Sequence, residues 1–148
     1  MLQGNFIQTN AVIYRWRFTG GLPPWFRADL CPGDWYWHLL HAEMGKIGFM
    51  PKVMSIYRRH KNAIYHTAHT SVINHRKIHG MQELAMYKAV NEHFNGKYFA
   101  DLATLANGVL VDFLKISMDK NDDSLLNIAT KKFPEFSKYF LESMKKLY

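Results

Sequence analysis

The chain has 148 residues, of which 48% are hydrophobic, 21% charged and 15% aromatic, and this composition excludes a disordered tail. A chain of this length can bury a core without cross-links, and its single cysteine, Cys31, cannot form an internal disulfide. No apolar run reaches the roughly 20 residues that span a bilayer, and the formal charge of +7 favours anionic partners: nucleic acid, anionic lipid or a phosphorylated small molecule.

The first half of the chain is rich in β-branched, aromatic, glycine and proline residues. Residues 6–18 favour a strand because they combine β-branched and aromatic side chains. Apolar residues at three- and four-residue spacing then predict a short helix that begins after Gly33 and ends at Gly45. Residues 47–50 and 53–57 are typical of two short strands or of one bent extended segment.

The second half has the periodicity of helices. Apolar side chains recur every three or four residues over 78–94, 98–116 and 136–147, which predicts three helices that pack through one face each. Asp122 and Asp123 fit the start of a further helix, where carboxylates satisfy free amides and oppose the helix dipole. We assign these two residues no chemistry.

Linked motifs follow one another between residues 9 and 60. The motifs are Thr9-Asn10-Ala11-Val12-Ile13-Tyr14-Arg15, Leu22-Pro23-Pro24-Trp25-Phe26, Gly33-Asp34-Trp35, Gly45-Lys46-Ile47-Gly48, and Val53-Met54 with Tyr57-Arg58-Arg59-His60. In this order and spacing they resemble the second, acceptor-side half of the catalytic domain in bacterial family-2 glycosyltransferases of the GT-A fold, which build surface polysaccharides. The resemblance covers roughly the first 70 residues.

The resemblance implies an α+β fold. Residues 1–70 would form a partial GT-A-type mixed sheet with a catalytic helix, and residues 71–148 a C-terminal extension of three to four helices. No two of the seven aspartates are spaced as the Asp-x-Asp metal motif of that family, and no glycine-rich nucleotide fingerprint occurs. We therefore expect a truncated enzyme whose nucleotide-binding half is absent and which is inactive in isolation.

The resemblance also gives roles to individual residues. Asp34 corresponds to the catalytic base, which takes the proton of the acceptor hydroxyl as the hydroxyl attacks the anomeric carbon with inversion. Arg58, Arg59 and His60 are implied contacts of the leaving diphosphate, and His60 is also the implied metal contact. A family enzyme often has an acidic residue before the base, where this chain has Gly33.

Two tryptophans are candidates for acceptor binding, and each keeps a second interpretation. Trp35 would stack on an acceptor sugar or belong to the core, and Trp25 would line the acceptor cleft or anchor a loop. Several histidines fall between residues 60 and 79, but without cysteine partners they are not typical of a zinc site.

The partners follow from the same resemblance. The complete enzyme would use a nucleotide-sugar donor, a glycan or lipid-linked acceptor and a divalent cation, Mn or Mg. The chain would meet a missing N-terminal half or a second copy, in the cytoplasm, with contact at the inner membrane face. Two alternatives stay open: a non-catalytic glycan-binding or interaction module and, less favoured, a basic nucleic-acid-binding helical protein. We expect no nucleic-acid binding, because the basic residues are spread along the chain.

Overall fold

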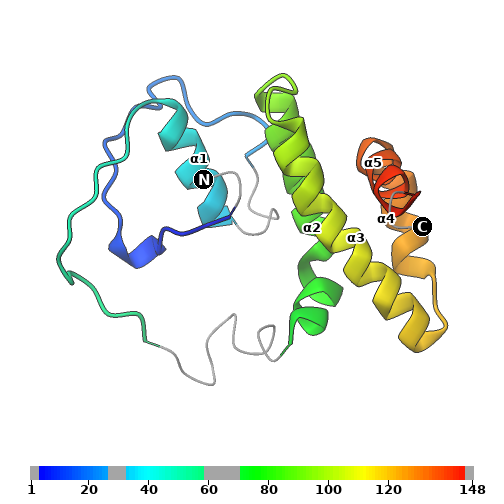
Figure 1. The fold of residues 1–148 in the computed structure, drawn as a ribbon. Coiled ribbons are helices and arrows are strands. Elements are labelled where there is room, and N and C mark those ends of the chain that lie inside the picture. Colours follow the sequence, from blue (N-terminus) through cyan, green and yellow to red (C-terminus); the bar gives the residue numbers. More distant parts are fainter. Residues whose placement is uncertain (1–3, 27–32, 59–70, 146–148) are drawn as a thin grey trace.

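The computed structural model describes residues 4–26, 33–58 and 71–145, and this part of the chain contains helices and extended segments but no strand (Figure 1). A 3-10 turn, η1, precedes five α-helices along the chain. The bounds are η1 Thr9–Ala11, α1 Gly33–Glu43, α2 Val72–His93, α3 Phe99–Lys120, α4 Ser124–Lys132 and α5 Pro134–Lys145.

The centre of the molecule is the hairpin of α2 and α3. The Ser71 side chain caps α2 by accepting the Asn74 amide hydrogen at 3.1 Å. The connection between the helices uses left-handed backbone at Asn95 and Gly96, with φ of 50° and 76°, and residues of these types tolerate that conformation. Fully buried residues of the two helices then form the main core, among them Leu84, Val90, Leu102, Val109, Leu110 and Phe113.

Helices α4 and α5 cover the other side of α3 (Figure 1). The Asp122 carboxylate accepts the Ser124 amide hydrogen at 2.9 Å, so it satisfies the start of α4 as the sequence predicts. Pro134 occupies the first position of α5, where its missing N–H costs nothing. The aromatic residues Phe133 and Phe136 are each 1% exposed and belong to the core.

Helix α1 lies beside the α2–α3 hairpin and is surrounded by the extended parts of the first half (Figure 1). Its Tyr36 and Leu40 side chains are buried. Its last residue, Glu43, accepts a hydrogen bond from His93 Nε2 at 2.7 Å, and the indole N–H of Trp25 donates to the other ring nitrogen of His93 at 3.2 Å. The C-terminal end of α2 therefore holds both α1 and the loop that precedes it.

A charged cluster at the other end of α2 ties this helix to α3. Arg76 bonds to Glu83 on its own helix, and its Nε donates to Asp112 of α3 at 3.1 Å. His75 Nε2 also lies 2.7 Å from Glu83. Because Glu83 is only 4% exposed, its charge depends on these partners, and removal of one of them would leave a buried charge uncompensated.

The predicted α+β fold is wrong for the described residues. Apart from η1, residues 6–18 and 47–57 have no regular secondary structure and form no ladder with each other, so the partial GT-A-type mixed sheet is absent from the part of the chain that the structure describes. The resemblance to the acceptor-side half of a GT-A glycosyltransferase is thereby contradicted. The physical reason is that β-propensity measures how well a residue fits a half-buried sheet, and a segment without a neighbouring strand has no sheet to fit.

The helical second half was predicted correctly, and the short helix from Gly33 also forms. The predicted division at residue 70 lies in the stretch 59–70, outside the described residues. None of the described helices combines the length and apolar character that a bilayer crossing requires.

Candidate functional site

The Asp34 carboxylate lies in the first turn of α1, where two hydrogen bonds fix it. Its Oδ1 accepts the Trp35 backbone N–H at 2.8 Å, and its Oδ2 accepts the hydroxyl of Thr9 at 2.7 Å. Thr9 belongs to η1, so the carboxylate joins the N-terminal segment to α1. A negative charge at this end of a helix is also favoured by the helix dipole. The side chain remains partly accessible, and each carboxylate oxygen has a second lone pair that can accept a further hydrogen bond.

Tyr14 and two histidines continue the same face of α1. His38 and His41 follow Asp34 by four and seven residues, which places the three side chains along one side of the helix. The Tyr14 hydroxyl lies 2.5 Å from His38 Nδ1, and its ring stacks on His41 with centroids 4.3 Å apart. These contacts bring residue 14 and residues 38–41 into one cluster.

Burial sets the protonation of this cluster. It raises the pKa of Tyr14 to about 12, and the charge of Asp34 adds to the shift. Burial also lowers the pKa of His38, an effect that Asp34 opposes, and the pKa of His41 is lowered by burial and by the charges of His38 and Arg17. At neutral pH the phenol is therefore protonated and both imidazoles are neutral. The Nε2 of His41 is buried and has no hydrogen-bond partner within the described part of the chain.

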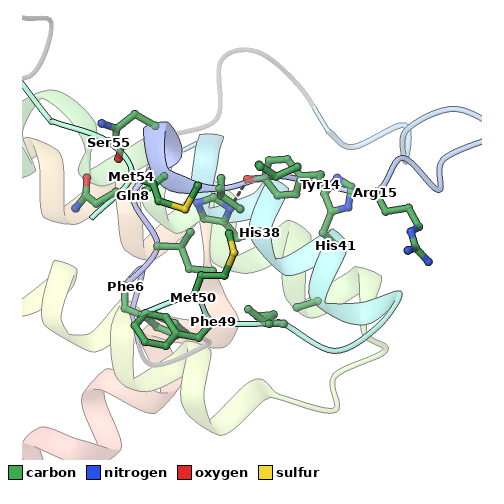
Figure 2. A pocket seen from close by; sticks show the side chains of 18 of the residues that line it. Phe6, Gln8, Tyr14, Arg15, His38, His41, Phe49, Met50, Met54 and Ser55 are labelled. Carbon is green, nitrogen blue, oxygen red and sulfur yellow. Dashed lines mark hydrogen bonds between the residues drawn. The ribbon is translucent and has the colours of Figure 1, made fainter. Parts of the chain in front are cut away.

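A cavity of about 720 Å³ opens next to the cluster (Figure 2). Its walls come from residues 6–17, from His38 and His41 of α1, and from residues 45–55. Figure 2 shows both histidines and Tyr14 on one side and Phe49, Met50 and Met54 on the other. Asp34 is not part of the wall itself, but it lies one helical turn before His38.

The wall of this cavity is apolar with a cationic component. Four basic side chains contribute to it: Arg15, Arg17, Lys46 and Lys52. Among the described residues, no aspartate or glutamate does so. One of these arginines already has a partner, because Arg17 Nη1 donates a hydrogen bond to the Met44 carbonyl oxygen, next to the end of α1, at 2.6 Å. The cavity is therefore suited to a ligand that has both apolar surface and negative charge.

The two tryptophans predicted to bind an acceptor are placed in packing positions. Trp35 is 5% exposed, and its ring meets that of Tyr87 edge to face at 6.1 Å. The half-buried Trp25 contacts Tyr36 and uses its indole N–H for His93. Both residues contribute to holding α1 and its preceding loop in place, and their contact with an acceptor stays a prediction.

The predicted diphosphate contacts are described only in part. Arg58 is exposed at the end of the segment 45–58, whereas Arg59 and His60 lie outside the described residues. Within the described ranges no group of three or more histidine, cysteine, aspartate or glutamate side chains is arranged to hold a metal ion. The role of His60 as a metal contact therefore stays a prediction.

Sequence reasoning missed Tyr14, His38 and His41 as parts of the site. The two histidines could have been found, because their spacing from Asp34 matches one helix face. The approach of Tyr14 could not, since it depends on how an irregular segment folds across α1.

Known proteins give a partial match to this chain. No protein-family profile matches it, and no solved structure matches it. The uncharacterized proteins Mb1547 of Mycobacterium bovis and Rv1520 of Mycobacterium tuberculosis (strain H37Rv) are 44% identical to it over 70 residues, which is 47% of this chain. The match covers 19% of the length of each relative, so these proteins are several times longer than the part they share with this chain.

Proposed function

We propose that this chain is part of an inverting glycosyltransferase, which moves a sugar from a nucleotide-sugar donor to a glycan or lipid-linked acceptor in surface polysaccharide synthesis. The observation that carries the proposal is the Asp34 carboxylate, which two hydrogen bonds hold one turn from a basic, partly apolar cavity. A carboxylate fixed in this way can take a proton from a hydroxyl group of a bound ligand.

In the proposed step, a hydroxyl of the acceptor attacks the anomeric carbon of the donor sugar while its proton passes to Asp34. The bond between the acceptor oxygen and the anomeric carbon forms as the bond from that carbon to the diphosphate oxygen breaks, and the diphosphate leaves with the electron pair. Thr9 and the Trp35 amide each occupy one carboxylate oxygen, which fixes the orientation of the base and leaves a second lone pair on each oxygen.

The cavity wall favours a lipid-linked acceptor over a free glycan. Such a molecule carries a phosphate group and a hydrocarbon chain, and the wall offers basic residues such as Lys46 and Lys52 beside apolar ones such as Phe49 and Met50. A lipid-linked acceptor would place the reaction at the cytoplasmic face of a membrane. Arg58 is the described residue proposed for the diphosphate, and a divalent cation, Mn or Mg, remains our expectation for the complete enzyme.

The Asp34→Asn variant tests the role of the base. We would measure sugar transfer from uridine, guanosine and thymidine diphosphate sugars with Mn²⁺, using this chain together with a polypeptide that binds the donor. Loss of the general base should lower the rate about 10²- to 10⁴-fold, while binding of a short polyprenyl diphosphate sugar changes little. Asp119→Asn is the matched control, because Asp119 is an exposed carboxylate on α3 far along the chain from the cavity. Full turnover in Asp34→Asn would refute the assignment.

A spectroscopic measurement tests whether the charge of Asp34 acts on the neighbouring His38. The charge of Asp34 raises the pKa of His38, so Asp34→Asn should lower that pKa further. The shift can be followed in the imidazole carbon-bound proton resonances of the isolated chain. If the pKa of His38 is the same in Asp34→Asn as in the unmodified chain, Asp34 does not face the cluster in solution.

A non-catalytic glycan-binding module is the second candidate, and one observation favours it. Trp16, Phe18 and Trp37 form a ring cluster with centroid distances of 5.7 to 5.8 Å, and Trp16 is 61% exposed. An exposed indole is suited to pack on a sugar ring. If the chain is such a module, Asp34→Asn should bind glycans as well as the unmodified chain does. Neither protein should then transfer sugar from any nucleotide-sugar donor.

A further inference from the structure

Ten large apolar side chains are exposed on two segments of the first half of the chain, 6–18 and 45–58. Phe49, Val53 and Ile56 are 88%, 95% and 88% exposed, whereas the much longer described stretch 71–145 has five exposed large apolar residues in all. Apolar surface that gathers in this way marks a site that binds a membrane or another protein. The ten residues are Phe6, Ile13, Trp16, Ile47, Phe49, Met50, Val53, Met54, Ile56 and Tyr57.

The two segments lie next to each other, because both contribute to the wall of the cavity. Segment 45–58 runs past α1 on the side away from the α2–α3 hairpin (Figure 1). Figure 2 shows Phe49, Met50 and Met54 at this wall. The exposed apolar residues are therefore gathered around one cavity rather than spread over the molecule.

The charged side chains of these segments are all positive. Residues 4–18 and 45–58 contain five basic residues and no acidic one, and all five are exposed. Arg15 and Arg17 flank Trp16 along the chain, and Arg58 follows Tyr57. At a bilayer surface, indole and phenol rings lie at the level of the headgroups, and basic side chains reach the lipid phosphates. The five basic residues are Arg15, Arg17, Lys46, Lys52 and Arg58.

These properties favour a lipid surface over a second copy of the chain. A second copy would bring the same positive charge to the contact, which disfavours self-association. An anionic bilayer offers negative phosphate groups beside hydrocarbon, and these complement the basic and the apolar side chains together. Segment 45–58 is irregular, and backbone N–H and C=O groups without partners are costly in hydrocarbon. Only side chains can therefore enter the lipid, while the backbone stays hydrated among the headgroups.

We propose that this surface, made of residues 6–18 and 45–58, binds the face of an anionic membrane. Phe49, Val53 and Ile56 enter the boundary between headgroups and acyl chains, and Lys52 and Arg58 contact lipid phosphates. Membrane binding does not depend on Asp34 acting as a base. It places the cavity beside the lipid, from which a lipid-linked acceptor would enter it, and this last link alone rests on the proposed function.

Co-sedimentation of the full chain with lipid vesicles tests the proposal. Vesicles of phosphatidylglycerol and phosphatidylcholine in equal parts are compared with vesicles of phosphatidylcholine alone. The chain should sediment with the anionic vesicles and much less with the neutral ones, and its binding should fall as the salt concentration rises. Absence of binding, or equal binding to both kinds of vesicle, would overturn the proposal.

A set of charge substitutions separates this surface from the general attraction of a basic protein to anionic lipid. Lys46→Gln, Lys52→Gln and Arg58→Gln together should weaken binding about 100-fold, because each basic residue near the membrane contributes a factor of about five. The control variant removes the same charge from the helical half and should lose much less affinity. Equal weakening by the two variants would mean that net charge alone drives binding. The control substitutions are Lys131→Gln, Lys138→Gln and Lys145→Gln, all at exposed positions.

A pair of apolar substitutions tests insertion into the lipid. Phe49→Ser with Val53→Ser should weaken vesicle binding at least about tenfold, because two side chains no longer leave water. Thermal unfolding should not change, since both side chains are exposed. Ile78→Ser with Ile128→Ser replaces exposed apolar residues of α2 and α4 and should bind vesicles like the unmodified chain. Full binding by the Phe49 and Val53 pair, or equal loss in the control pair, would contradict insertion at this surface.

Membrane binding and sugar transfer can fail separately. Asp34→Asn should bind vesicles at least as well as the unmodified chain, even where it transfers no sugar. Sugar transfer by an unmodified chain that binds no vesicles would overturn the membrane proposal alone. A dimer in solution that Phe49→Ser with Val53→Ser dissociates would show that a second copy covers this surface, and would also overturn it.

Discussion

The contact between α2 and α3 at Gly80 yields a prediction of definite sign. A Cβ at this position would lie 2.7 Å from two ring carbons of Phe113 and 3.2 Å from a methyl carbon of Val109. Ordinary carbon contacts are about 3.5 to 4.0 Å. Phe113 and Val109 are both fully buried, so neither side chain can swing into solvent. The Gly80→Ala variant therefore forces the two helices apart.

Two opposing effects determine how much Gly80→Ala changes the free energy of unfolding. Overpacking of a core typically costs about 1 to 3 kcal/mol, while replacing a mid-helix glycine by alanine returns about 0.5 to 1 kcal/mol. We expect Gly80→Ala to lower the free energy of unfolding by about 1 kcal/mol. Gly108→Ala, on the exposed side of α3 with nothing within 4 Å, should raise it by about 1 kcal/mol.

Thermal and urea unfolding followed by circular dichroism measure the difference between the two variants. For a chain of this size a gap of about 2 kcal/mol corresponds to roughly 4 to 8 °C in Tm. Truncating the clashing ring, in the double variant Gly80→Ala with Phe113→Leu, should cost less than the sum of the single changes. If Gly80→Ala is as stable as Gly108→Ala, the close approach of the helices is wrong.

Two further predictions concern the histidines and the loop anchor. Burial holds the pKa of His38, His41 and His75 below the ordinary value of 6.5, so the unfolded chain binds more protons than the folded one at mildly acidic pH. The contribution of these histidines to the free energy of unfolding should be complete above about pH 6.5 and should fall as the pH is lowered below that value. A urea midpoint that increases as the pH is lowered from about 7.5 to 5.5 would contradict this. Trp25→Phe should cost about 1 to 2 kcal/mol through the lost hydrogen bond to His93 and the smaller ring, whereas the exposed Trp16→Phe should stay within about 0.5 kcal/mol in the same assay.

The helices could be predicted from the sequence because a helix satisfies its own backbone. The periodicity over 78–94 and 98–116 specifies both the element and its buried face, and α2 and α3 form there. The helix from Gly33 was also predicted, although the described segment that follows it, 45–58, is irregular. Local signals sufficed wherever the hydrogen bonds were local.

The extended segments could not be predicted in the same way. The residues of 6–18 and 47–57 have β-propensity, but a strand needs a partner that the local sequence does not specify. Large apolar side chains of the second segment, such as Phe49, Val53 and Ile56, therefore stay exposed. The role of Asp34 was predicted from its motif and stays a prediction, while Tyr14 reaches His38 and His41 through tertiary contacts that no local pattern encodes.

The two halves of the molecule therefore contribute in different ways. The α2–α3 hairpin is closed on itself, and it holds α1 in place through His93, which accepts from Trp25 while donating to Glu43. Since the Trp25 indole N–H can only donate, Nδ1 of His93 must accept, and the proton must sit on Nε2 for Glu43. The two ring nitrogens of His93 thus join the loop and α1 to the core. Helix α1 is fixed by this contact, whereas the cavity wall formed by residues 45–55 is an irregular segment with exposed apolar side chains.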